Sequence, residues 1–370
     1  MDLEFSRRYL SEHGIRSGQT NALIADRALA RSIAIRPDSR GRLSMTVNGR
    51  ECWFDGAKSN LNGALARRCA QHKDITSRLL RSSGVNSPEN MVFSPQQLAS
   101  AWSWAESVGP VVVKPPSGGL GRSVHLNLQS IEEFQTAFEA VSAESGAVLV
   151  ERFLQGTEHR VLMIYGKVAA AARRIPANVL GNGEDSVREL VEEKNLQRRE
   201  SRNPAHWELP VDDHTVKELA RQDLTLESVP AAGHQVWLRS NSNVHSGGDG
   251  VDATDELTSD EIAMAQRAVR VIPGLKLAGL DMLLPREGLD CEPYVLEVNA
   301  YPMITGHHHP WTGQERDVAG MLVDAMFPGA PTLDTAQPGS AQNPGVAAHR
   351  SRRRSLLRRA ASRLLRPLRR

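Results

Sequence analysis

A lysine followed by a glycine-rich stretch is the first feature of this sequence whose residues could do chemistry. The segment VVVKPPSGGLGRSV places Lys114 after three valines and then brings Ser117, Gly118, Gly119 and Gly121. Backbone N–H groups of such glycines can hold phosphate oxygens, and a lysine adds positive charge beside them. The order differs from a P-loop, because the lysine precedes the glycines. An ordinary glycine-rich turn is the alternative to a phosphate site.

Two acids and an amide near the end of the sequence suit a divalent metal. Asp281 lies in the segment GLDMLL, and Glu297 and Asn299 lie in LEVNAYP. Oxygen ligands on neighbouring strands suit Mg²⁺, which completes its shell with phosphates and water. Structural salt bridges are the alternative, although a buried strand such as YVLEVNA seldom carries an acid without a partner or a metal.

Between these two features, a strand runs out into a connector that suits a nucleotide. Backbone groups of Glu151, Phe153 and Leu154 can face a purine edge. The carboxylates of Glu151 and Glu158 can accept hydrogen bonds from an amino group and from ribose hydroxyls. By itself, this segment could also be any amphipathic strand and turn.

Capping residues and hydrophobic periodicity predict the elements that must position these groups. Helices are expected where Ser94, Ser130 and Thr258 can cap the first turn and where Gly84 and Gly109 can end the last one. The expected helices are 72–84, 94–109, a segment from 130, a segment from 258 and 317–327, and the expected strands are 111–113, 147–153, 160–165, 168–172 and 294–298. Mixed helices and hairpins predict an α+β (α/β) fold.

The order of these groups resembles the ATP-grasp superfamily. That order is Lys73, Lys114, the glycine loop, Glu151, Glu158, Asp281 and EVNAYP. Residues 72 to 327 are most similar to the ATP-grasp domain of cyanophycin synthetases and of related glutathione-forming ligases. The stretches that carry the likeness are GTEHRVLMIYGKVAAAARRIPANVLGNGEDSVRELVEEKN, VPAAGHQVWLRSNSNVHSGGDGVDATDEL, LKLAGLDMLL and EVNAYPMITGHHHPWTGQERDVAGMLVDAMF. The Mur-ligase-like domain of cyanophycin synthetases is not found in this sequence.

This resemblance implies an ATP-grasp fold, in which two α+β lobes grip ATP after a small N-terminal domain. It also implies ATP and two Mg²⁺ ions as cofactors, with Mn²⁺ as a substitute. A substrate carboxylate would take the γ-phosphate, and an amine would then displace phosphate to form an amide. Lys73 and Lys114 would bind phosphates, and Arg239 and Lys114 would act in catalysis.

The resemblance also implies a substrate-binding set. It places Asn243, Gly247 and Gly248 in a loop beside the phosphates and His308 in a loop beside the substrate. Arg160 and Arg174 are candidates for gripping a substrate carboxylate, or for structural ion pairs instead. Zinc binding by the triplet at 307–309 is disfavoured, because neighbours on an extended chain point in alternate directions. A solvated loop remains the alternative for these histidines.

The composition divides the chain into four parts. An N-terminal domain is expected over 1–70 and an ATP-grasp domain over 71–328, with a central lobe at 71–155 and a C-terminal lobe at 156–328. A disordered linker rich in Pro, Gly, Ala and Gln is expected over 329–349. Residues 350–370 form an Arg- and Leu-rich basic tail without any acid.

The remaining expectations concern location and partners. No leader or long apolar run is found, and the three cysteines are scattered, so a cytosolic protein without a disulfide framework is expected. Small acid and amine substrates and a homo-oligomer are expected, without a specific nucleic acid. The tail could contact an anionic membrane peripherally, tether an anionic polymer or be simply solvated. An ATP-grasp kinase, or an ATP-gated regulatory or binding protein acting through the tail, is the alternative function.

Overall fold

The structure is a computed structural model that describes residues 3–16, 18–117, 123–286, 288–289 and 291–330. Gly118, Gly119 and Gly121 lie outside the described residues. So do residues 331–370, which comprise the basic tail and nearly all of the expected linker. The described helices and strands build four hydrophobic cores, taken in turn below.

The first core joins the beginning of the chain to the end of the described part. Leu10 and Ile24, near the N-terminus, pack in one cluster with Leu322 and Met326. The ion pairs Arg31–Asp324 (2.5 Å) and Arg27–Asp317 (2.7 Å) cross the same contact. The elements of the leading segment are α1 (Leu3–Glu12), α2 (Gln19–Ala30) and the sheet β1 (Ile35–Pro37), β2 (Leu43–Val47), β3 (Arg50–Asp55) and β4 (Lys58–Ser59), and the last helix is α11 (Val318–Met326).

The second core lies under one face of the five-stranded antiparallel sheet that carries the candidate site. Its strand order is β13-β10-β9-β14-β15, and α3, α4 and α9 cover this face. Along β9, Val161 and Met163 enter this core, while Leu162 and Ile164 enter the first core on the opposite face. The elements are α3 (Ala64–Gln71), α4 (Lys73–Ser82), β9 (Thr157–Ile164), β10 (Lys167–Ile175), β13 (Asp249–Asp252), η3 (Thr254–Glu256), α9 (Ser259–Arg270), β14 (Leu277–Leu284), β15 (Tyr294–Asn299) and α10 (Thr305–His308).

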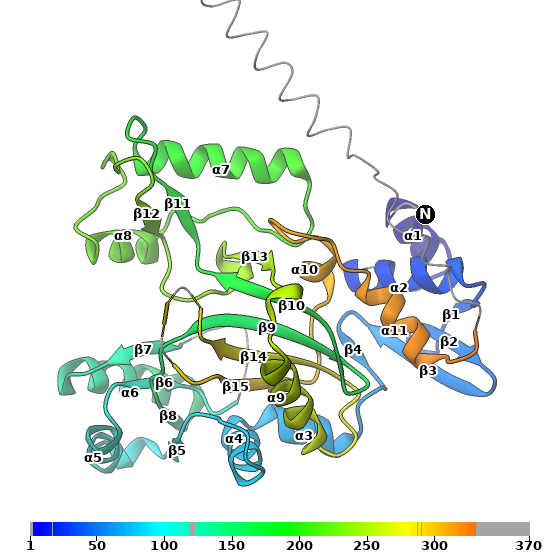
Figure 1. Ribbon diagram of the computed structural model, residues 1–370, viewed down its shortest axis with the longest axis horizontal. Helices are drawn as coiled ribbons and strands as arrows, with labels where there is room; N and C mark the ends of the chain where they lie inside the picture. Colours follow the sequence, from blue (N-terminus) through cyan, green and yellow to red (C-terminus); the bar gives the residue numbers. More distant parts are fainter. Residues whose placement is uncertain (1–2, 17, 118–122, 287, 290, 331–370) are drawn as a thin grey trace, which may run out of the picture. The chain divides into compact units, whose positions relative to one another are not determined.

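The third core belongs to a smaller antiparallel sheet with the order β5-β8-β6-β7. Phe134 and Phe138 of α6 and Ala101 of α5 pack against Val113 and Val150, so both helices cover one face of this sheet (Figure 1). The elements are β5 (Asn90–Phe93), η1 (Pro95–Gln97), α5 (Leu98–Val108), β6 (Val111–Lys114), β7 (His125–Leu128), α6 (Ile131–Ser145) and β8 (Val148–Arg152).

The fourth core lies in a segment inserted between β10 and β13, which we call the insert (residues 176–248). Val191, Leu209, Leu219 and Val236 are among its buried residues. Its elements are β11 (Asn178–Leu180), α7 (Val187–Ser201), α8 (Asp213–Ala220), β12 (Gln235–Trp237) and η2 (Val244–Ser246) (Figure 1).

The expected mixed α+β architecture is confirmed, and the caps explain why the predicted elements begin where they do. Ser94 and Gln97 form a capping box ahead of α5, Ser130 accepts from the backbone of Glu133, and Thr258 caps α9. Each cap satisfies N–H groups that lack a partner within the helix. The boundaries of the expected domains stay predictions.

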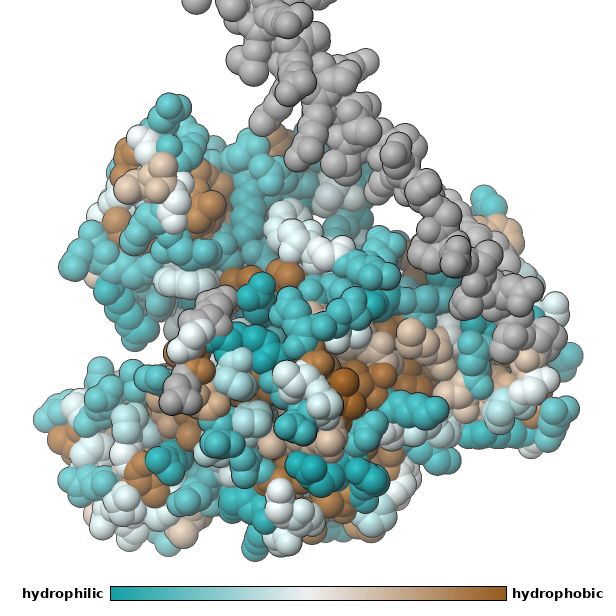
Figure 2. Space-filling view, in the orientation of Figure 1, coloured by the Kyte–Doolittle hydropathy of each residue, from teal (hydrophilic) through white to brown (hydrophobic). Residues whose placement is uncertain are grey.

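The surface is largely polar on the face drawn in Figure 2, where hydrophobic residues form scattered patches among hydrophilic ones. Among the described residues, no helix combines the length and apolar character that crossing a membrane requires. Cys52 and Cys69 are buried free thiols, and Cys291 is partly exposed.

Candidate active site

Pairing of β14 with β15 brings the predicted metal ligands together. Asp281 lies directly opposite Glu297, and Gly279 lies opposite Asn299. Side chains of directly opposed residues share a face of the sheet, as do residues two apart on one strand. Asp281, Glu297 and Asn299 therefore present three oxygen-bearing side chains to one face. The side-chain oxygen of Asn299 also accepts from the backbone N–H of Tyr301 at 2.8 Å.

Three cations pair with the acids of this face. Arg160 binds Asp281 in a fork, with Nε–Oδ1 at 2.5 Å and Nη2–Oδ2 at 3.1 Å. Arg174 lies 3.1 Å from Glu158 and 3.7 Å from Asp281, and Lys73 lies 2.9 Å from Glu297. Burial alone would raise the pKa of Asp281, but Arg160 and Arg174 outweigh it and hold that pKa below its usual value.

The donor set suits a hard divalent ion that also takes phosphate oxygens. Two carboxylates and an amide oxygen are ligands that Mg²⁺ accepts, and Mg²⁺ typically uses only one or two protein carboxylates beside substrate phosphates. Within the described ranges, no group of three or more His, Cys, Asp or Glu side chains is placed to hold a metal ion. The two carboxylates and the amide oxygen of this face fit an ion that is also bound by nucleotide phosphates.

Lys73 connects this face to the predicted phosphate loop. Its side chain pairs with Glu297, and its backbone N–H donates to the carbonyl of Pro116 at 3.3 Å. Pro116 is two residues beyond Lys114 and next to Ser117, which is exposed. The loop joins the paired strands β6 and β7, so its two ends are fixed in the smaller sheet. The structure thus links Lys73, the loop and the acidic face.

The predicted purine and ribose contacts lie at the exit of β8 and the start of β9. Glu151 is buried and pairs with Lys114 at 2.5 Å. Phe153 and Leu154 follow in a half-buried connector, and the backbone N–H of Phe153 donates to the carbonyl of Pro110 at 2.7 Å.

The turn before β9 requires a glycine. Gly156 has a φ of +152°, and a Cβ there would lie 2.9 Å from the Cβ of Leu283. A side chain at this turn would therefore clash.

Arg239, Asn243, Gly247 and Gly248 were expected beside the phosphates. The Arg239 guanidinium donates to Thr215 Oγ1 (2.6 Å), to the Leu238 carbonyl (2.7 Å) and to Asp212 (2.8 Å), all within the insert. This arrangement stabilises the start of α8. A catalytic role of Arg239 stays a prediction.

The loop after Arg239 reaches the site through a different residue. Ser242 donates a hydrogen bond to Glu158, which also pairs with Arg174. Asn243 accepts from the backbone N–H of His245 at 3.0 Å and caps η2. Nothing in the sequence pattern singled out Ser242, and an S-N-S-N run offers too many equivalent polar groups to choose among.

The histidine triplet begins in a short helix rather than on an extended chain, which corrects the geometry assumed from the sequence. His307 and His308 belong to α10 and are both buried. His308 Nε2 accepts from the backbone N–H of Ala319 at 3.0 Å, so it supports α11. Burial, and to a smaller extent the positive charge of Arg160, lowers the pKa of His307 to about 3.

Protonation of His308 should destabilise the fold. Burial lowers the pKa of His308 to about 4 from an ordinary 6.5, so between these pH values the unfolded chain binds more protons than the folded one. The contribution of His308 to the free energy of unfolding is fully present above about pH 6.5. It is lost as the pH falls toward 4, by about 1.4 kcal/mol per pH unit. Urea unfolding at pH 7 and pH 5 should show a smaller pH dependence in His308→Gln than in the parent protein. An unchanged pH dependence would contradict the assignment.

Known proteins provide an independent comparison. No family model matches the chain. A cyanophycin synthetase of Trichormus variabilis is 38% identical over 273 residues, which cover 72% of this chain and 30% of that protein. A glutathione biosynthesis bifunctional protein GshAB of Listeria innocua is 34% identical over 264 residues, covering 70% of this chain and 34% of that protein. The structure of a bifunctional glutathione synthetase from Pasteurella multocida superposes with a TM-score of 0.63 at 27% identity, covering 88% of this chain and 46% of that one.

The fold, the acidic face and these relatives define the class: the chain is an ATP-grasp protein. More particularly, it is homologous to cyanophycin synthetases and to GshAB proteins, and it spans about a third of the length of these relatives.

Proposed function

We propose that this protein is an ATP-dependent carboxylate–amine ligase that forms an amide or peptide bond and releases ADP and phosphate. Its substrates would be an amino acid or a small peptide and an amine. The relatives support this proposal, because their names describe synthesis of cyanophycin and of glutathione. A cytosolic location, a homo-oligomeric state and a peripheral membrane contact through residues 350–370 are parts of the same proposal that rest on the sequence alone.

The observation that carries the proposal is the pairing of the acids of this face with cations. Lys73 pairs with Glu297, and Arg160 pairs with Asp281. The magnesium complex of ATP would bring a cation for these carboxylates and phosphate anions for the lysine, and a substrate carboxylate would be a partner for the arginine. Each charge on the face could therefore change partner and still be paired. An unpaired charge in a partly buried site would be costly in free energy.

In the proposed reaction, a substrate carboxylate oxygen attacks the γ-phosphorus to give an acyl phosphate and ADP. The amine then attacks the acyl carbon, and phosphate leaves. Lys73, Lys114 and the backbone N–H groups of the glycine loop stabilise the charge on the phosphoryl oxygens. Asp281, Glu297 and Asn299 would hold Mg²⁺, which when bound neutralises phosphate charge. Arg174 or Arg160 would orient the substrate carboxylate, and no side-chain nucleophile is required.

Purified protein incubated with Mg-ATP and pooled amino acids tests the proposal. Phosphate release that depends on the amino acids, with a condensed product found by mass spectrometry, is the expected result. Formation of AMP and pyrophosphate would sink the acyl-phosphate route. A phosphorylated acid without a condensed product would favour an ATP-grasp kinase. Deletion of residues 340–370 should leave ligase activity intact, whereas a function centred on the tail should disappear.

A further inference from the structure

The insert leaves and rejoins the five-stranded sheet at one place. Ile175, the last residue of β10, lies opposite Asp249, the first residue of β13. Between these positions the insert has its own hydrophobic core. A unit attached through two neighbouring backbone positions needs further contacts to fix its orientation. Contacts at this junction therefore help to fix the orientation of the insert on the sheet.

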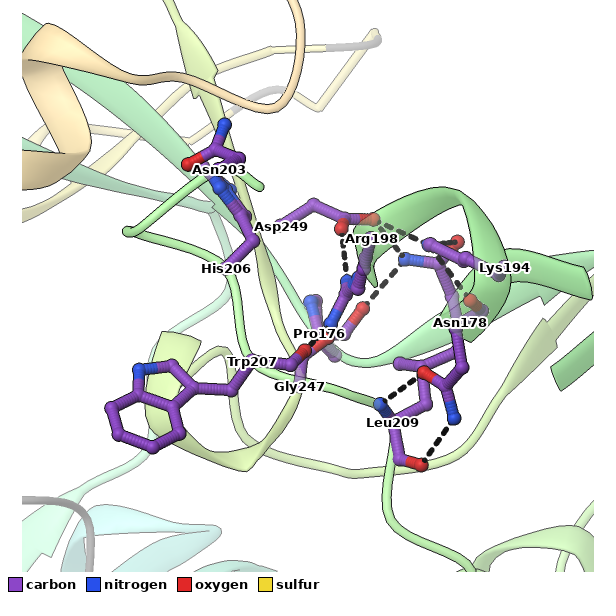
Figure 3. Close-up of polar contacts among 12 residues, drawn as sticks. Pro176, Asn178, Lys194, Arg198, Asn203, His206, Trp207, Leu209, Gly247 and Asp249 are labelled. Atoms are coloured by element: carbon purple, nitrogen blue, oxygen red, sulfur yellow. Dashed lines mark hydrogen bonds and ion pairs between the residues drawn. The ribbon is translucent and has the colours of Figure 1, made fainter. Parts of the chain in front are cut away.

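Asp249 is the centre of a buried cluster at this junction (Figure 3). Arg198 Nη2 donates to its Oδ1 at 2.6 Å, Lys194 Nζ to its Oδ2 at 2.7 Å and Asn178 Nδ2 to its Oδ2 at 3.1 Å. The side chains of Arg198 and Asp249 are 1% and 5% exposed. Lys194 and Arg198 are four residues apart on α7 and so share one side of that helix. The cluster joins α7 of the insert to β13 of the sheet.

Three further contacts strengthen the junction. His206 Nε2 accepts from the backbone N–H of Gly250 at 3.0 Å. The centroid of the Trp311 ring lies 5.2 Å from the Arg198 guanidinium carbon and 5.9 Å from Lys194 Nζ, which suits cation–π contacts. The junction is thus built from charged and aromatic groups whose geometry is specific.

The same arginine also holds the loop that reaches the candidate site. Arg198 Nη2 donates to the carbonyl of Gly247 at 3.0 Å, and its Nη1 donates to the carbonyl of Trp207. A Cβ at Gly248 would lie 2.9 Å from the carbonyl oxygen of Ile175, so the loop packs tightly on the junction. At the other end of this loop, Ser242 donates to Glu158.

We propose that Lys194, Arg198 and Asp249 are positioning residues that hold segment 239–248 against Glu158 and so set the nucleotide side of the site. Removing Arg198 would leave the buried carboxylate of Asp249 with fewer partners and would release the carbonyl of Gly247, whereas removing Lys194 would affect the carboxylate alone. The segment would then move relative to Glu158 and Arg174. The effect on catalysis rests on the proposed function, whereas the effect on the segment does not.

Hydrogen–deuterium exchange of the whole chain, residues 1–370, tests the placement directly. Arg198→Met should raise the exchange rates of amides in 239–248 by about tenfold or more, because local opening becomes easier. Arg199→Met is the matched control, since Arg199 is the next residue on α7 and pairs with Glu208 in solvent, the side chains being 53% and 52% exposed. It should leave these rates unchanged. Asp249→Asn keeps the shape of the carboxylate and provides a second variant if Arg198→Met does not fold.

Steady-state kinetics test the effect of the segment's position on catalysis. kcat/KM for ATP should fall by about 10–100-fold in Arg198→Met, because small misplacements of binding groups are costly, and Arg198→Lys should recover part of it. Unchanged exchange in 239–248 in Arg198→Met and Asp249→Asn would overturn the inference, as would faster exchange with an unaltered kcat/KM. If the parent protein shows no ATP-dependent phosphate release, the proposed function fails, and faster exchange would still support the placement of the segment.

Discussion

Glu297→Gln should lower ATP-dependent phosphate release by about 10²–10³-fold, the loss typical when one group that stabilises transition-state charge is removed. Glu297 lies opposite Asp281 on neighbouring strands and pairs with Lys73 at 2.9 Å. The glutamine keeps the shape of the side chain but loses its charge, so both metal affinity and the position of Lys73 should suffer. Phosphate release under saturating Mg-ATP measures the effect.

Direct Mn²⁺ binding, followed by electron paramagnetic resonance in the presence of nucleotide, provides a second measurement for this variant. Binding should weaken in Glu297→Gln and stay as in the parent protein in Glu292→Gln. Glu292 is an exposed acid just before β15 and so serves as the matched control. Parent-like metal binding and phosphate release in Glu297→Gln would remove Glu297 from the metal site.

Lys114→Met should both destabilise the protein and abolish tight nucleotide binding. Lys114 and Glu151 lie 2.5 Å apart, with side chains 12% and 5% exposed. Breaking a buried pair by removing one partner typically costs about 3–5 kcal/mol, because the remaining charge is uncompensated. The methionine also removes the positive charge that the phosphates would meet. Urea unfolding and calorimetric titration with nucleotide measure the two effects.

The double variant Lys114→Met/Glu151→Gln separates these effects. It should recover most of the lost free energy of unfolding, because no isolated charge remains buried, but it should not recover nucleotide affinity. Lys167→Met, at an exposed position at the start of β10, should leave both quantities unchanged. A single variant at Lys114 that unfolds within about 1 kcal/mol of the parent would show that the pair contributes little to stability.

Local signals made much of the site's framework predictable. The capping residues Ser94, Ser130 and Thr258 act within three residues of their helices, so their effect can be read directly from the sequence. The same holds for the strands at 111–113 and 294–298. One signal of this kind was overlooked, since Ser186 and Glu189 form a capping box that begins α7 and thereby places Lys194 and Arg198.

Long-range pairing could not be predicted in the same way. Arg160 and Asp281 are far apart in sequence and meet only because β9 and β14 pair in one register. Both were singled out, one for a substrate and one for a metal, yet the structure pairs them with each other. Likewise, the place of Arg239 follows from the fold of the insert around α8 rather than from its neighbours in sequence.

The core that joins both ends of the described chain has a consequence for the order of folding. Leu10 and Ile24 pack in one core with Leu322 and Met326. Of these four residues, Leu322 and Met326 are synthesised last. While the chain is still growing on the ribosome, α2 therefore lacks the helix that covers its apolar side. Contacts between segments so distant in sequence form slowly, and the nascent chain exposes apolar surface until then. Chaperone demand during synthesis should thus be concentrated on the first helices of the protein.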